Sequence, residues 1–98
     1  MRKDKVKGMH KQLYRAILMV ENEEECEKLF EDLFTISEIN AAAQRLEVAV
    51  RLKNGGTCNG ISEDMGVSTA TVSRVNKCLN YGPGGYDLIL ERLKNNES

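Results

Sequence analysis

Apolar residues recur at helical spacing along most of the chain. Leu13, Ile17 and Val20 share one face of a first helix, which we predict over about 10–21. A second helix follows Asn22 and carries an apolar stripe from Cys26 to Phe34. Asn22 stands three residues before Glu25, which is the spacing of an N-cap and a reciprocal acid. The first part of the chain is therefore predicted to be a pair of amphipathic helices.

A longer helix is predicted over about 36–53. Thr35 and Glu38 repeat the capping spacing at its start, and the glycines of Asn54–Gly56 end it, because glycine accepts the left-handed conformation of a C-terminal cap. Its apolar positions are Ile36, Ile39, Ala42, Ala43, Leu46, Ala49 and Val50. No stretch alternates between apolar and polar residues as a strand does, so the expected fold class is all-α.

The domain boundaries follow from where this pattern stops. Residues 1–9 are basic and lack apolar periodicity, so they are expected to be a flexible arm. Residues 10–94 form one domain, and residues 95–98 form a tail. The apolar stripes of the short helices exceed what one small core can cover, which favours a homodimer.

The stretch from Thr57 to Asn80 has the pattern of a helix-turn-helix. A short helix runs to Met65, Gly66 breaks it, and Ser68 caps a second helix that continues through Leu79. Ser62 is small where the two helices approach each other most closely. The apolar residues predicted to pack across the angle are Ile61, Met65, Val67, Val72 and Val75.

The same geometry leaves short polar and basic side chains outside, at or near the start of the second helix. They are Ser68, Thr69, Ala70, Thr71, Ser73, Arg74 and Lys77. In a helix-turn-helix this end enters the major groove, where hydroxyls bond to bases or phosphates and a methyl group meets a thymine methyl. The alternative is a helix pair that uses serine and threonine only as caps, as in a protein-interaction module.

The total charge hides three regions of opposite sign. The 98 residues have a formal net charge of −1, which excludes a uniformly basic nucleic-acid binder. Residues 1–15 nevertheless carry six basic groups against Asp4 alone, and residues 21–38 carry eight acids against Lys28. Residues 40–81 are again slightly basic. A locally basic face is therefore compatible with the composition.

The remaining chemistry of the sequence is sparse. Three cysteines without CxxC spacing (Cys26, Cys58 and Cys78) and the single His10 fit neither a disulfide framework nor a metal site, and the cysteines are expected to be small buried hydrophobes. We predict no enzyme, no cofactor and no membrane span, and a cytoplasmic location. Tyr81 and Tyr86 are expected to pack the last helix.

The segment Gly66–Gly82, followed by Gly84, Gly85 and Tyr86, resembles the Trp repressor superfamily, and most closely its YerC/YecD branch. The resemblance covers about residues 10–94. It implies six helices per subunit in an intertwined homodimer, with the N-terminal helices and a last helix at about 84–94 forming the interface. It also implies a sequence-specific transcription regulator in which Thr69, Ala70 and Ser73 read bases, and Asn59 and Ser62 contact backbone or base edges.

The resemblance also implies a site for an effector. Thr71 and Arg74 match two of the tryptophan-binding positions of the Trp repressor. The third matches Arg45 if the loop at 54–57 is one residue shorter here, and Gln44 otherwise. Val75 stands where the Trp repressor has the glycine that leaves room for the indole ring, so we predict that L-tryptophan is not the co-repressor. Two arginines facing one crevice would suit the carboxylate of another small effector.

The sequence thus predicts a homodimeric DNA-binding transcription regulator whose partner is double-stranded DNA. The simplest interpretation is that it acts as a repressor. The competing class is a dimeric helical interaction adaptor with a structural helix-turn-helix.

Overall fold

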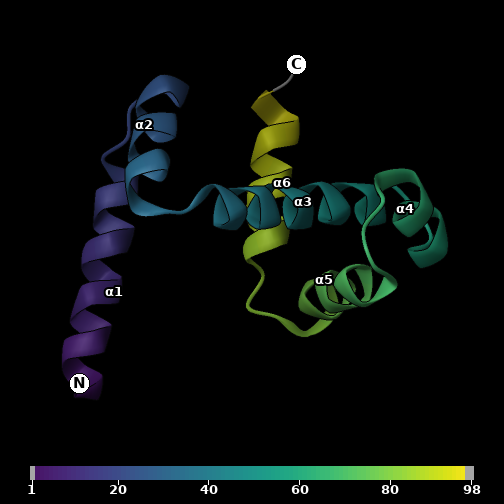
Figure 1. The fold of residues 1–98 in the computed structure, drawn as a ribbon, viewed down its shortest axis with the longest axis horizontal. Helices are drawn as coiled ribbons and strands as arrows, with labels where there is room; N and C mark the ends of the chain where they lie inside the picture. Colours follow the sequence, from purple (N-terminus) through teal and green to yellow (C-terminus); the bar gives the residue numbers. More distant parts are fainter. Residues whose placement is uncertain (1, 97–98) are drawn as a thin grey trace. The chain divides into compact units, whose positions relative to one another are not determined.

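The computed structural model describes residues 2–96, and these form six α-helices (Figure 1). In chain order the helices are α1 (Lys3–Leu18), α2 (Glu23–Leu33), α3 (Ile36–Lys53), α4 (Cys58–Met65), α5 (Thr69–Tyr81) and α6 (Gly85–Asn96). The predicted all-α fold class is confirmed. The chain divides after Ile39, within α3, into two compact units.

Helix α1 begins earlier than the apolar pattern predicts. It starts at Lys3 and ends at Leu18, so residues 3–9, assigned to a flexible arm, are helical. Lysine and methionine are good helix formers, and Asp4 in the first turn interacts favourably with the helix dipole. Local propensity therefore extends the helix where no apolar periodicity marks it. Met1 of the predicted arm, and residues 97–98 of the predicted tail, lie outside the described residues.

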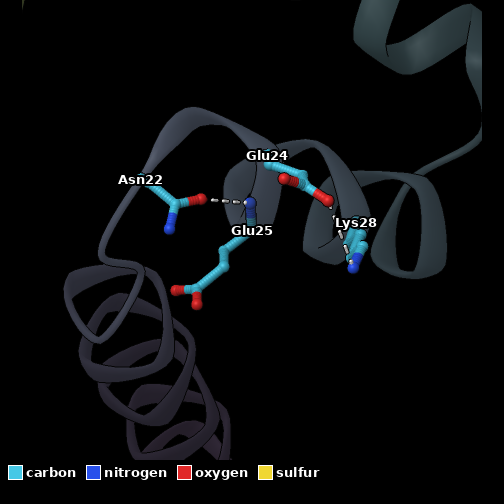
Figure 2. Close-up of polar contacts among 4 residues, drawn as sticks. All are labelled: Asn22, Glu24, Glu25 and Lys28. Carbon is cyan, nitrogen blue, oxygen red and sulfur yellow. Dashed lines mark hydrogen bonds and ion pairs between the residues drawn. The ribbon is translucent and has the colours of Figure 1, made fainter.

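Helix α2 begins at the cap that the sequence predicts. The Asn22 side chain accepts a hydrogen bond of 2.9 Å from the Glu25 N–H (Figure 2). The Glu25 carboxylate in turn accepts one of 3.0 Å from the N–H of Glu21, one residue before the cap. Glu24 and Lys28 form an exposed ion pair of 3.6 Å one turn further on. Caps of this kind contribute about 1 kcal/mol, so they fix where the helix starts more than they stabilise the fold.

The core of the second unit is small and lies between α3, α4 and α5. Five side chains are fully buried: Val48, Ala49, Ile61, Val72 and Val75. Partly buried side chains that pack against them include Met65 and Val67, as predicted, and also Leu52, Cys58, Leu79, Tyr86 and Leu90. Through the last two, α6 packs on this core. An ion pair of 2.9 Å between Lys53 Nζ and Asp87 Oδ1 also joins α3 to α6.

The buried face of α3 includes only part of the apolar positions that the sequence pattern predicts. Val48, Ala49 and Leu52 contact the core, whereas Ile36 is 70% and Leu46 is 37% exposed. Both stripes repeat at helical spacing, and only the first set meets α4 and α5. The predicted apolar positions of α3 are therefore divided, because Ala49 is buried in the core whereas Ile36 and Leu46 are exposed.

Two further expectations about packing are wrong. Cys78 is exposed, while Cys26 and Cys58 are partly buried, and all three are free thiols. Tyr81 is 84% exposed because it ends α5 on the solvent side, and only Tyr86 packs against the core. Within residues 2–96 no helix is long and apolar enough to span a membrane.

Candidate nucleic-acid interface

Two capped helices and a glycine turn make up the helix-turn-helix of the second unit. The Thr57 hydroxyl accepts a hydrogen bond of 3.1 Å from the Gly60 N–H and so starts α4. Gly66 ends α4 with φ +70°, a left-handed conformation that an L-residue adopts only at a cost. The Ser62 hydroxyl donates a hydrogen bond of 2.5 Å to the Val67 carbonyl. This bond holds the turn against α4, and α4 packs on α5 (Figure 1).

Helix α5 starts at a cap that uses two of the predicted site residues. The Ser68 hydroxyl accepts a hydrogen bond of 3.1 Å from the Thr71 N–H. The two hydroxyls are also 2.9 Å apart and share a hydrogen bond. Val72 and Val75 are buried on the inner side of the helix. The cap and these two valines together fix which side of α5 faces outward.

The outward side of α5, with its N-cap Ser68 and two residues of α4, forms the candidate interface. Its exposed residues are Asn59, Ser68, Thr69, Ala70, Ser73, Arg74 and Lys77, while Ser62 and Thr71 are partly buried. Helix α5 contains no acidic residue, and among the ion pairs of residues 2–96 none involves Arg74 or Lys77. Both charges are therefore available to an anionic partner.

Several hydroxyls of the predicted site already have partners inside the protein. Ser62 is bonded to the turn, and Thr71 is bonded to the cap. The Ser73 hydroxyl lies 3.6 Å from Cys58 Sγ. Thr69, Ala70, Asn59, Arg74 and Lys77 are consequently the members of the set whose side chains have no such bond within the described chain.

Cys58 is the residue of this region whose role the sequence reasoning missed. It is the first residue of α4, and its thiol lies 3.8 Å from the Thr69 carbonyl oxygen as well as 3.6 Å from the Ser73 hydroxyl. These contacts connect the start of α4 to the first turns of α5. The sequence gives no signal for them, because a cysteine without a second ligand at fixed spacing looks like any small apolar residue.

The residues of the proposed effector site lie on two helices. Val75 is only 1% exposed and is part of the core, as expected of a helix-turn-helix valine. Arg45 on α3 is partly buried, Gln44 is exposed, and Arg74 on α5 is exposed. No hydrogen bond or ion pair within residues 2–96 joins Arg45, Thr71 and Arg74. An effector crevice between the two arginines stays a prediction.

The described residues contain no candidate metal site. Over the described residues, no three His, Cys, Asp or Glu side chains are grouped closely enough to hold a metal ion.

Known proteins share both the sequence and the fold. The chain is similar to the uncharacterized protein YerC of Bacillus subtilis (strain 168), with 48% identity over 96 residues that cover 97% of this chain and 92% of that protein. A crystallised TrpR-like protein from Eubacterium eligens ATCC 27750 is 49% identical, with a TM-score of 0.81 over 86% of this chain and 87% of that chain. A candidate Trp repressor from Staphylococcus aureus is 42% identical, with a TM-score of 0.85 over 96% and 95%.

Residues 9–94 match the family described as Trp repressor protein. This match includes the helix-turn-helix and most of α1, and it agrees with the two solved structures in sequence and in fold. The chain therefore belongs to the Trp repressor family.

Proposed function

We propose that this protein is a sequence-specific DNA-binding transcription regulator that acts as a homodimer and represses by occluding a promoter. The observation that carries the proposal is the exposed side of α5. There Thr69 and Ala70 are exposed beside two basic side chains, Arg74 and Lys77, on a helix without acids. Short side chains let a helix approach base edges closely, and cations contact phosphates. Membership of the Trp repressor family supports the same conclusion.

The homodimer is supported by uncovered apolar surface in both units. In the second unit these side chains include Leu46, Leu88, Ile89 and Leu93, and in the first they include Tyr14, Leu18 and Met19. Leu46 and Ile89 also line an apolar hollow of about 370 Å³ next to Pro83. Leu46 and Ile89 share this hollow, and a second copy of the chain would cover such an apolar surface.

A two-fold dimer would present two copies of α5 to one side of a duplex. Successive major grooves are about 34–36 Å apart, so the operator would be a near-palindrome with half-sites one helical turn apart. We place this activity in the cytoplasm, with DNA as the partner and with no enzymatic reaction or cofactor.

L-tryptophan is not the co-repressor in this proposal. The Val75 side chain fills core space, whereas the Trp repressor has a glycine at the matching position beside its ligand. Because Val75 packs α5 against the core, we propose that α5 holds its position without an effector. Calorimetric titration of the protein with L-tryptophan should give no heat of binding. Tight, stoichiometric binding would overturn this part of the proposal.

The decisive experiment is selection of binding sites from random duplex DNA. We expect a single near-palindromic sequence, and an affinity that falls steeply with salt through counterion release. Thr69→Ser and Ala70→Ser should change the selected bases, while Lys77→Gln should weaken all sites about equally. Asn76→Ala, an exposed substitution on the same helix but outside the candidate interface, serves as the matched control.

The opposite results favour another class of function. If selection enriches no sequence and binding is independent of salt, the helix-turn-helix is a structural element of a dimeric interaction adaptor. In such an adaptor, Ser62 and Thr71 would serve only the internal hydrogen bonds that they make at the turn and at the cap of α5. The oligomeric state is tested separately by the sedimentation mass of the free protein, and a monomeric mass at micromolar concentration would reject the dimer.

A further inference from the structure

Tyr81, the last residue of α5, has a fully presented side chain that nothing in the chain covers. Its exposed fraction is 84%, which is higher than that of any other large apolar side chain among residues 2–96. Within the same residues its hydroxyl has no hydrogen-bond partner and its ring contacts no other ring. Tyrosine combines a large ring with a polar tip and is enriched where proteins meet their partners. The packing of this chain therefore does not account for Tyr81.

The end of α5 holds Tyr81 in a defined place. The Gly82 N–H donates a hydrogen bond of 2.8 Å to the Cys78 carbonyl, and a Cβ at Gly82 would collide with the same carbonyl oxygen. The helix thus closes tightly on a residue without a side chain. Leu79, in the same turn, packs against the core. Tyr81 is therefore presented from an anchored helix end.

Tyr81 lies on the same side of α5 as residues of the candidate interface. Lys77 precedes it by four residues and Ala70 by eleven, which is about one and about three helical turns. All three side chains are exposed, while Val72 and Val75 occupy the buried side of the helix. The outward side of α5 thus continues from the candidate interface to the last residue of the helix.

The length of α5 separates the surroundings of Tyr81 from those of Ala70 when the helix is bound to DNA. At a rise of about 1.5 Å per residue, the two residues lie about 16 Å apart along the helix axis. The major groove is about 12 Å wide, and a helix-turn-helix directs the N-terminal residues of its second helix at the base edges. With Ala70 at the bases, the other end of α5 lies at the rim of the groove, beside the phosphate backbone.

We infer that the Tyr81 hydroxyl donates a hydrogen bond to a phosphate at the rim of the major groove and so positions α5 on the DNA. The inference rests on the proposed function, because it assigns a further contact to the same DNA-bound helix. Tyrosine hydroxyls are donors to phosphate oxygens. The sequence holds no acid between Asp64 and Asp87, so no carboxylate next to Tyr81 along the chain repels the phosphate.

DNA is a better partner for Tyr81 than a second copy of the chain. Tyr81 shares its side of α5 with Lys77, which is exposed and forms none of the ion pairs found among residues 2–96. Charged side chains are depleted at the core of protein–protein interfaces, whereas a cation beside a tyrosine suits a phosphate backbone.

The test uses the salt dependence of DNA affinity to distinguish a neutral hydrogen bond from an ionic contact. The native protein, Tyr81→Phe and Tyr81→Ala are titrated with the selected operator at several salt concentrations. Tyr81→Phe removes only the hydroxyl and should weaken binding about tenfold at every concentration, because hydrogen bonds to charged groups are strong ones. The slope of log K against log [salt] should stay native, since a neutral donor releases no counterion. Lys77→Gln should change that slope by about 0.9.

A second measurement locates the phosphate. Operators are prepared in which one phosphate at a time is replaced by an uncharged methylphosphonate. One replacement in each half-site should weaken the native protein more than it weakens Tyr81→Phe, because the variant has already lost that contact. Site selection with Tyr81→Phe should return the native sequence, since phosphate contacts carry no direct base information.

Tyr86→Phe is the matched control, because it makes the same chemical change on a tyrosine whose ring packs against the core. It should bind the operator as the native protein does. Tyr81 is exposed, so the urea midpoints of Tyr81→Phe and Tyr81→Ala should stay close to the native one.

The outcomes separate this inference from the proposed function. Sequence-selective binding with native affinity in Tyr81→Phe overturns the hydroxyl contact and leaves the regulator intact, even if Tyr81→Ala binds more weakly. Native DNA affinity combined with weaker dimerisation of Tyr81→Ala overturns it in favour of contact with a second copy. Absence of DNA binding by the native protein rejects both the inference and the proposed function.

Discussion

Val75 supports the recognition helix through the core, and its truncation tests how much this small core depends on one side chain. The residue is 1% exposed and belongs to the buried cluster with Val72 and Ile61. Val75→Ala removes two buried methyl groups, at about 0.8 kcal/mol each. The space left behind adds up to about 1 kcal/mol, because a core relaxes only partly around a truncated side chain. Alanine is the better helix former, which offsets about 0.5 kcal/mol.

The expected net loss is therefore about 2 kcal/mol in the free energy of unfolding, estimated from burial and helix propensity. With a urea m-value of about 1.5 kcal/mol/M, the midpoint of unfolding should fall by about 1.3 M. Asn76 is the neighbouring exposed residue, and Asn76→Ala should change the free energy of unfolding by less than about 0.5 kcal/mol. Equal midpoints for Val75→Ala and the native protein would refute the assignment of Val75 to the core and, with it, the physical reason for excluding tryptophan.

Three further predictions concern local features. Gly66→Ala should lower the free energy of unfolding by about 1 kcal/mol through the left-handed φ of +70° alone, because no atom lies within 4 Å of the added Cβ. Gly8→Ala inside α1 is equally unobstructed and should be neutral or stabilising in the same urea titration. Asp87→Asn should lose at most about 1 kcal/mol, and the difference from the native protein should disappear in 1 M salt, because the Lys53 pair is half-exposed. The Thr35 backbone N–H, followed by the Thr35 hydroxyl, lowers the pKa of Glu38 below its ordinary value. The pKa of Glu38 is thus lower in the folded than in the unfolded protein, so its carboxylate stabilises the fold at pH values above the unfolded pKa. This contribution is lost as the pH falls through the folded pKa. Urea midpoints measured between about pH 6 and pH 3 should therefore depend less on pH in Glu38→Gln than in the native protein.

Helix ends were predictable from the sequence wherever a cap determines them. Asn22, Thr35 and Ser68 each accept the backbone hydrogen bond that their spacing predicts, and Gly66 takes the left-handed conformation. These interactions connect residues three or four positions apart, so a single sequence contains all the information they need. The start of α1 was missed because its Arg2 cap makes no side-chain hydrogen bond and leaves no such signature.

The buried face of α3 could not be predicted in the same way. Its two apolar stripes repeat with the same period, and they differ only in what the rest of the chain places beside them. Val48 and Ala49 meet α4 and α5, whereas Ile36 and Leu46 stay exposed. Helical periodicity identifies a face as apolar, but the partner that covers it is a tertiary property.

The candidate interface was predictable in outline and not in its internal bonding. The sequence placed Thr69, Ala70, Arg74 and Lys77 on the outward side of α5, and these side chains are exposed. It gave no indication that Ser73 shares a contact with Cys58. That contact joins residues fifteen positions apart on two helices, and no local rule encodes it.

The five-residue core of the second unit has a consequence for how the amount of protein is controlled. So few buried side chains supply little of the free energy needed to order a chain, and a small domain commonly obtains the rest from association. If two copies fold together as proposed, the melting temperature rises with protein concentration by mass action. At a lower concentration in the cell, the protein would then be lost to proteolysis as well as to dissociation of the dimer. The fraction of DNA sites that it occupies would therefore fall more steeply than the rate at which it is synthesised.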